Sequence, residues 1–177
     1  GYTWIVTRMF TKFHTPVPLW SQNVRMIVWP RRVTAVKLFL DFEAYADEEA
    51  DPFSYGTSSW AIIKEETRQP QRLNAVIDPP EAEPRRAFAD RKLGILPFVD
   101  RATFTMEQPV RSYDLDFNLH LNSVRYVAAA IETIPYDFRT QHELTAIDAA
   151  FVRETYLGDP IRSECAQQDG QFVHRFI

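Results

Sequence analysis

The sequence has 177 residues, of which 45% are hydrophobic and 14% aromatic, enough apolar material to build a packed core. Its 20 basic and 24 acidic residues leave a formal charge of -4, so no dominant cationic field would attract nucleic acid. The single cysteine, Cys165, excludes an intramolecular disulfide framework and favours a reducing compartment, with the cytoplasm as the default. Because neither an apolar run of about 18 residues nor a secretory pattern occurs, we expect no membrane span and no signal peptide.

The first part of the chain has the composition of β-strands. Trp, Phe, Val, Ile and Thr dominate residues 4–66, and turn signals such as Pro30 and Asp51-Pro52 interrupt them. We expect four strands there, at residues 3–14, 22–29, 33–46 and 57–66.

Residues 67–98 differ in character, because prolines and basic residues are scattered along them. The basic residues of this segment include Arg85, Arg86, Arg91 and Lys92. This composition is typical of a linker between two folded parts, and we place that linker at residues 79–98. Alternatively, the arginines would hold an acidic protein partner.

The second part of the chain combines strands with one amphipathic helix. A strand is predicted at residues 103–111, and a helix at 123–134, where apolar residues recur at spacings of three and four before Pro135. Three more strands are predicted at 144–156, 161–167 and 171–177. This order is typical of an α+β fold.

A faint internal repeat links the two parts. Residues 13–25 and 151–162 both contain a strand, a turn and the start of another strand. The repeat predicts two copies of one fold, the first of which would lack the strand and helix that should precede residue 1.

The densest group of reactive side chains lies at residues 113–122, between a predicted strand and the predicted helix. Its members are Tyr113, Asp114, Asp116, Asn118, His120 and Asn122. Catalytic groups favour such junctions, and a helix N-terminus offers unpaired N–H groups to an oxyanion that forms when a carbonyl is attacked.

Metal binding is a weaker interpretation of this group. Positions one, three and five of a calcium loop are matched, but Leu119 stands where that loop needs glycine and Arg125 where it needs glutamate. Zinc is disfavoured because His120 has no histidine or cysteine at ligand spacing. The remaining alternative is structural: Asp and Asn residues cap the helix, and His120 is an ordinary polar residue.

A family resemblance favours catalysis over helix capping. The pattern Ser112-Tyr113-Asp114-Leu115-Asp116-x-Asn118-x-His120-x-Asn122, followed by Val124-x-Tyr126, resembles the signature of plant and bacterial acyl-acyl carrier protein (acyl-ACP) thioesterases. Further segments resemble the family in family order: Trp4–Arg8, Val28–Arg31, Asp41–Tyr45, Thr57–Trp60 and Thr67–Leu73. The chain departs from the family pattern at Ser123, where a second asparagine is usual, and in the extra Tyr113.

The resemblance implies a tandem hotdog fold. In each of its two units a curved antiparallel sheet wraps around a long helix, and the two units pack together. Residues 1–78 would form a first, incomplete unit, and residues 99–177 a second unit that carries the site. The implied activity is hydrolysis of the thioester of a fatty acyl chain on acyl carrier protein. Neither a cofactor nor a metal is implied.

Carried over residue by residue, the family site falls on Asp116, Asn118 and His120, with Glu164 and Cys165 from a strand beside the helix start. In one mechanism Glu164 is the general base for a water that Asn118 positions, while Asp116 and His120 orient Asn118. In the other, Cys165 is a thiolate nucleophile paired with His120. Because neighbouring strand side chains point to opposite faces, Glu164 and Cys165 should not both face the substrate.

Substrate contacts are expected from Asn122, and from Arg85 and Arg86 toward an acidic carrier protein. A homodimer is an assembly that this interpretation allows. The alternatives are a hotdog thioesterase acting on coenzyme A thioesters and a non-catalytic acyl-binding domain. The expected compartment is the cytoplasm of a bacterium, or the plastid stroma of a plant.

Overall fold

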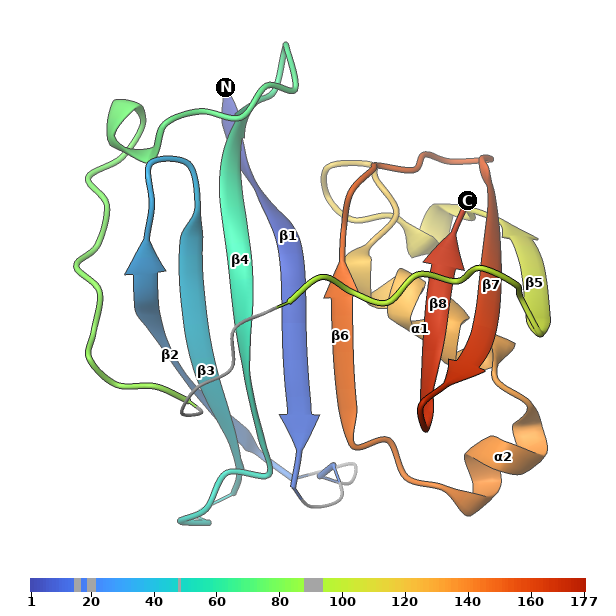
Figure 1. The fold of residues 1–177 in the computed structure, drawn as a ribbon. Helices are drawn as coiled ribbons and strands as arrows, with labels where there is room; N and C mark the ends of the chain where they lie inside the picture. The colour runs from blue at the N-terminus through green and yellow to red at the C-terminus, as the bar shows by residue number, and fades with distance from the viewer. Residues whose placement is uncertain (15–16, 19–21, 48, 88–93) are drawn as a thin grey trace. The chain divides into compact units, whose positions relative to one another are not determined.

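The computed structural model describes residues 1–14, 17–18, 22–47, 49–87 and 94–177 (Figure 1). The chain divides into two compact units. The first comprises Gly1–Leu93 and Leu144–Ala150, and the second comprises Gly94–Glu143 and Phe151–Ile177. None of the described helices is long and apolar enough to span a membrane.

The first unit is a five-stranded antiparallel sheet. Its strands are β1 (Tyr2–Phe13), β2 (Val24–Val33), β3 (Leu38–Ala46), β4 (Ser54–Lys64) and β6 (Ala146–Ala150), in the order β2-β3-β4-β1-β6. The last strand comes from the C-terminal half of the chain and pairs with β1 from Arg8–Ala150 to Lys12–Ala146. The first unit therefore needs a segment that lies far away in the sequence.

Close packing at Gly56 explains why a glycine stands in the middle of β4. A Cβ there would lie 2.1 Å from the backbone oxygen of Phe10 and 2.5 Å from the ring of Phe42. The missing side chain makes room for the Phe42 ring, which comes from the neighbouring strand. At the other end of this sheet, Leu38 and Ile62 pack against Leu73, which lies in the short 3₁₀ turn Leu73–Ala75.

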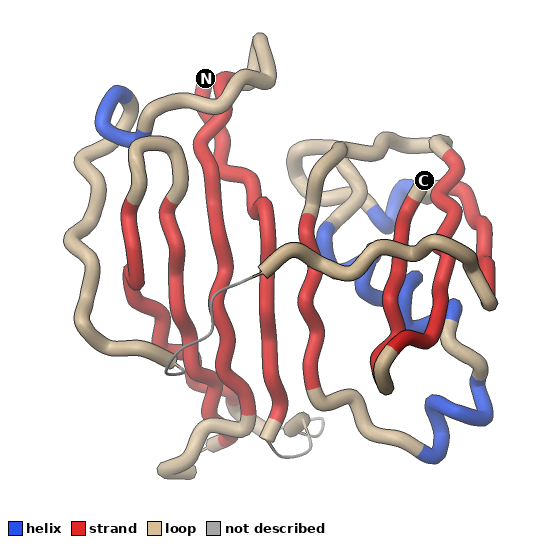
Figure 2. Tube along the Cα trace, viewed as in Figure 1, coloured by secondary structure: helices blue, strands red, loops and turns tan. Residues whose placement is uncertain are grey.

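The second unit packs a helix on a three-stranded antiparallel sheet. The strands are β5 (Phe104–Pro109), β7 (Pro160–Gln168) and β8 (Gln171–Phe176), in the order β5-β7-β8. The helices α1 (Ser123–Thr133) and α2 (Tyr136–Gln141) belong to this unit (Figure 2). Its core contains Val110, Leu121, Ala129 and Ile161, with the ring of Tyr126 packed against them.

The predicted α+β class is confirmed, and the strands and the helix α1 lie where the sequence predicts them within a few residues. In the structure, the strand predicted at 33–46 begins only at Leu38. The residues before it form a turn, in which the Thr34 hydroxyl accepts from the Lys37 N–H at 2.9 Å. The predicted strand at 144–156 also ends early, at Ala150, and residues 151–159 leave the sheet. Helix α2 was not predicted.

The position of residues 144–150 bears on the expected division of the chain. The sequence places these residues in the second unit, 99–177, whereas their strand pairing groups them with the first unit. The boundaries at residues 78 and 98 stay a prediction.

Candidate functional site

The residues before α1 form a tight turn that is organised by Asp116. One oxygen of its carboxylate, Oδ1, accepts from the N–H of Asn118 at 2.8 Å and from the N–H of His120 at 3.3 Å. The Asp116 N–H donates to the carbonyl oxygen of His120 at 2.8 Å. Leu119 closes the turn in the left-handed region, with φ at 62°. The structure thus brings Asp116, Asn118 and His120 together.

The side chain of Asn118 takes no part in the hydrogen bonds that form this turn. Among the described residues its carboxamide makes no hydrogen bond, since only the backbone of Asn118 is held by Asp116. A carboxamide donates from nitrogen and accepts at oxygen, so Asn118 can bind either a water or a carbonyl group.

Asn122 has a structural role at the start of α1. Its side-chain oxygen accepts from the N–H of Val124 at 2.9 Å and so caps the helix. Its own N–H donates to the carbonyl oxygen of Asp114 at 2.9 Å, which fixes the helix start to the preceding turn. The substrate contact expected of Asn122 stays a prediction.

A glutamate that the sequence analysis did not select lies beside His120. Oε2 of Glu154 is 3.7 Å from Nε2 of His120, and it also accepts from the hydroxyl of Tyr156 at 3.3 Å. The ring of Tyr156 meets the ring of His120 edge to face, with centroids 4.9 Å apart. The side chains of His120 and Glu154 are 16% and 30% exposed, so this acid–base pair is partly shielded but open to water.

The segment that carries Glu154 is held in place by hydrogen bonds to Leu121, Tyr126 and Asp159. The Leu121 N–H donates to the carbonyl oxygen of Thr155 at 2.8 Å, and the hydroxyls of Tyr126 and Thr155 lie 2.5 Å apart. The N–H of Tyr156 donates to the carboxylate of Asp159 at 2.9 Å. Residues 154–156 are therefore held against the helix start although they belong to no strand.

Glu164 lies in the middle of β7 and is paired with two arginines. Arg175 donates to Oε2 of Glu164 through Nη2 and, at 3.2 Å, through Nε. Nη2 of Arg162 lies 3.3 Å from Oε1 of Glu164. The carboxylate is buried and its charge is compensated on both sides, which is the arrangement of a structural ion pair.

The strand register places Glu164 on the sheet face that points away from α1. Ile161 packs with the helix residue Ala129, and Phe176, the partner of Ser163, packs in the same cluster. Because β7 pairs without a register shift, Glu164 points to the opposite face.

Cys165 does point toward the α1 face, but it is far along the strand from the helix start. It lies four positions along the strand from Ile161, which packs with Leu121, and that is a distance of about 13 Å at about 3.3 Å per residue. Its sulfur lies 3.6 Å from Nε2 of His174. Burial raises the pKa of the Cys165 thiol to about 11 and lowers the pKa of His174 to about 4. The structure pairs Cys165 with His174 and not with His120.

The arginines expected to hold a carrier protein are engaged within the first unit. The guanidinium of Arg85 lies 4.1 Å from the ring centroid of Trp29 and pairs with Glu43, while the Trp29 ring N–H donates to the Arg85 carbonyl oxygen at 3.0 Å. Nη1 of Arg86 donates to the carbonyl oxygens of Glu83 and Arg85 at 2.6 and 2.9 Å. Arg91 and Lys92 lie outside the described residues.

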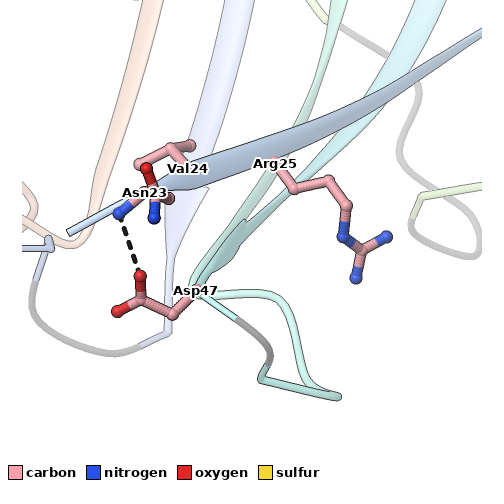
Figure 3. Close-up of a pocket in the computed structure, with 4 residues that line it drawn as sticks. All are labelled: Asn23, Val24, Arg25 and Asp47. Atoms are coloured by element: carbon pink, nitrogen blue, oxygen red, sulfur yellow. Dashed lines mark hydrogen bonds between the residues drawn. The ribbon is translucent and has the colours of Figure 1, made fainter.

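A pocket in the first unit contains none of the expected site residues. It is lined by Asn23, Val24, Arg25 and Asp47, and the Asn23 N–H donates to the carboxylate of Asp47 at 3.0 Å (Figure 3). Among the described residues, no group of three or more His, Cys, Asp or Glu side chains is placed to hold a metal ion.

Comparisons with known proteins show which proteins this chain resembles. Residues 99–176 match the acyl-ACP thioesterase C-terminal domain. The oleoyl-acyl carrier protein thioesterase 2 of Arabidopsis thaliana is 28% identical over 173 residues, which cover 90% of this chain and 46% of the relative. A palmitoyl-acyl carrier protein thioesterase of Gossypium hirsutum is 26% identical over 157 residues, 85% of this chain and 38% of that protein. The chain thus spans about half the length of the curated relatives it matches, or less.

Solved structures show the same fold. An acyl-ACP thioesterase from Bacteroides thetaiotaomicron superposes with a TM-score of 0.73 at 22% identity, covering 99% of this chain and 70% of that one. The 12:0-ACP thioesterase of Umbellularia californica gives 0.76 at 21% identity, with coverages of 96% and 67%. The predicted hotdog fold is therefore confirmed, and residues 99–176 match the C-terminal domain of acyl-ACP thioesterases.

Proposed function

We propose that this chain carries out the hydrolytic step of a fatty acyl-ACP thioesterase, releasing a free fatty acid from the carrier. The observation that supports this most directly is the pair formed by His120 and Glu154 beside the turn of Asp116 and Asn118. The curated relatives are named for thioester hydrolysis on acyl carrier protein. Fold alone would not imply activity, so the proposal depends on these side chains.

In the proposed reaction a water attacks the thioester carbonyl. Glu154, next to His120, takes a proton from the water while the new carbon–oxygen bond forms. The carboxamide of Asn118 donates to the carbonyl oxygen as negative charge develops there. The carbon–sulfur bond then breaks, and the proton passes from the base to the leaving thiolate. The products are a fatty acid and the thiol of the carrier.

We assign the base to Glu154 in place of Glu164 on the basis of their surroundings. A base must lie within reach of its water in a plausible substrate position, and Glu154 shares its site with His120. Glu164 accepts hydrogen bonds from Arg175 and forms an ion pair with Arg162 on the other face of the sheet. Proton acceptance by Glu164 would break that ion pair.

A cysteine mechanism has less support. A thiol is a nucleophile as its thiolate, and a pKa of about 11 keeps Cys165 protonated near neutral pH. The neighbouring His174 is half-buried and has a pKa of about 4, which makes it a weak base. Cys165 is fully buried, so a substrate would have to open the α1–sheet interface to reach it.

The proposed partner is acyl carrier protein with its acyl chain; a homodimer also belongs to the proposal. Coenzyme A thioesters are the alternative substrates, because their reacting group is the same. The relatives from Arabidopsis thaliana are named as chloroplastic acyl carrier protein thioesterases, which supports the carrier and, for a plant source, the plastid stroma. For a bacterial source we propose the cytoplasm.

The test is release of free fatty acid from acyl-ACP and from acyl-CoA with several chain lengths, in water enriched in ¹⁸O. We expect hydrolysis that is faster on the carrier, with the label in the fatty acid carboxylate after a single turnover. A folded chain that binds acyl-ACP but releases no acid would contradict the proposal and favour a non-catalytic acyl-binding domain. Faster release from acyl-CoA would overturn the choice of carrier.

A further inference from the structure

We propose that the hydrogen bond between the hydroxyls of Tyr126 and Thr155 positions Glu154 against His120, so that Tyr126 and Thr155 are positioning residues of the site. This inference rests on the proposed function for its catalytic consequence. Its geometric part, which is the placement of residues 154–156 beside His120, stands independently of any activity.

The first observation is the short contact itself. The two oxygens lie 2.5 Å apart, at the short end of the range for hydrogen bonds between hydroxyl groups. Tyr126 is on α1 and Thr155 is in the irregular segment after β6, 29 residues away in the sequence. The bond therefore joins a regular helix to a segment that has no strand partner.

The environment of Tyr126 makes it a firm anchor. Its ring packs edge to face against Phe176, with centroids 5.4 Å apart, and lies 6.1 Å from the ring of Phe151. Burial raises the pKa of its hydroxyl, so this group keeps its proton and remains available as a donor. A ring fixed by its neighbours holds the hydroxyl in one place at little cost in side-chain entropy.

Thr155 lies between the two residues that contact His120. Glu154 precedes it and brings Oε2 to 3.7 Å from the imidazole, and Tyr156 follows it and places its ring 4.9 Å from the same imidazole. The backbone bond from Leu121 to the Thr155 carbonyl sets the distance of this segment from the helix start. This one hydrogen bond would still let the segment rotate about it. The side-chain hydrogen bond from Thr155 to Tyr126 supplies a second point of attachment.

Two attachment points on one residue explain how an irregular segment can hold a catalytic carboxylate. A displacement of about 1 Å at a reacting group can lower a rate by roughly 100-fold. Removal of the Tyr126–Thr155 bond should therefore lower kcat while leaving KM unchanged, because neither hydroxyl is proposed to contact the acyl chain or the carrier.

The test compares Thr155→Val, which keeps the shape of the side chain without its hydroxyl, with Thr155→Ser, which keeps the hydroxyl. Tyr126→Phe removes the other partner and leaves the ring in place. We expect Thr155→Val and Tyr126→Phe each to lower kcat roughly 10- to 100-fold, with KM unchanged, and Thr155→Ser to behave as wild type. The double variant should lose no more than either single variant, because both remove the same bond.

A readout without substrate separates this inference from the proposed function. The His120 ring lies against the Tyr156 ring, so its NMR signals report the position of the segment through the ring current. At constant pH these signals should shift in Thr155→Val and Tyr126→Phe but stay in place in Thr155→Ser. Shifted signals in a chain that hydrolyses nothing would support the positioning and contradict only the proposed function.

The inference would be overturned by unchanged His120 signals in Thr155→Val, by equal activity of Thr155→Val and Thr155→Ser, or by losses that multiply in the double variant. If Thr155→Val does not fold, Tyr126→Phe carries the same test. Tyr136→Phe, which alters an exposed tyrosine at the start of α2, is the matched control and should change neither kcat nor the His120 signals.

Discussion

Two short segments of the second unit each carry a glutamate followed by a small residue, and they differ in every other respect. Glu164-Cys165 lies in the middle strand of a regular sheet, where both side chains meet cross-strand partners on β8. Glu154-Thr155 lies in a segment without strand pairing, fastened by Leu121 and Tyr126. The regular segment buries its glutamate among arginines, whereas the irregular one brings its glutamate to His120.

The comparison shows how backbone structure decides what a carboxylate can do. In β7 the alternation of side chains sends Glu164 and Cys165 to opposite faces, and each has a neighbouring partner from β8. The segment at 151–159 has no strand partner, and its Glu154 and Tyr156 both contact the same imidazole, that of His120. Four substitutions test this difference.

The largest effect is expected for Glu154→Gln, which removes the charge and keeps the shape. Loss of a general base should lower kcat by about 10²- to 10⁴-fold, while the melting temperature stays near that of wild type because this carboxylate is partly exposed. Steady-state kinetics and a thermal melt check both parts. A variant that melts much earlier, with activity lost in proportion, would make Glu154 a structural residue.

Glu164→Gln should act mainly on stability. Removing the charge leaves Arg162 and Arg175 without their buried partner, but both arginines are partly exposed and can turn to water. The full cost of breaking a buried pair is therefore reduced, and we expect a loss of about 2 kcal/mol in the free energy of unfolding. Urea denaturation measures it; an unchanged midpoint would show that the ion pair contributes nothing.

The pair of Cys165 and His174 predicts how stability depends on pH. Burial lowers the pKa of His174 from 6.5 to about 4, so between these values the unfolded chain binds a proton that the folded chain does not. This contribution to stability is complete above about pH 6.5 and is lost as the pH falls toward 4, by at most about 3 kcal/mol. Urea midpoints at pH 7 and pH 5 should differ less in His174→Gln than in wild type; equal differences would refute the role of His174.

The smallest effect is expected for Cys165→Ala. With a pKa of about 11 and no exposed surface, the thiol should take no part in hydrolysis, and kcat should stay close to that of wild type. Iodoacetamide should likewise modify the native chain slowly at neutral pH. Loss of activity in a folded Cys165→Ala variant would restore the cysteine mechanism.

Much of the fold could be predicted from the sequence because it depends on short-range patterns. The helix α1 follows from apolar residues at helical spacing and from Pro135, and β7 and β8 from the turn signal at Asp169-Gly170, where Gly170 has a positive φ of 76°. The inference that Glu164 and Cys165 face opposite sides is confirmed by their separate partners. Helix α2 was missed because six residues are too few for a helical period to be recognised.

The part of the site that could not be predicted depends on where a strand loses its partner. Residues 146–156 have a composition typical of one continuous strand, but β1 pairs with them only as far as Ala150. Nothing in the local sequence marks that point, since Phe151 and Val152 are as apolar as the residues before them. The pairing of Glu154 with His120 follows from this early end and from tertiary hydrogen bonds at Thr155. A non-local contact of this kind leaves no signal in residue spacing.

The central claim is that Glu154, and not Glu164, serves the thioester site. It is tested most directly by measuring fatty acid release from acyl-ACP by wild type, Glu154→Gln and Glu164→Gln in one assay, each at a temperature well below its melting point. The account predicts that Glu154→Gln loses at least about 100-fold in kcat while Glu164→Gln keeps a rate close to that of wild type. Loss of activity in Glu164→Gln with retention in Glu154→Gln would contradict it.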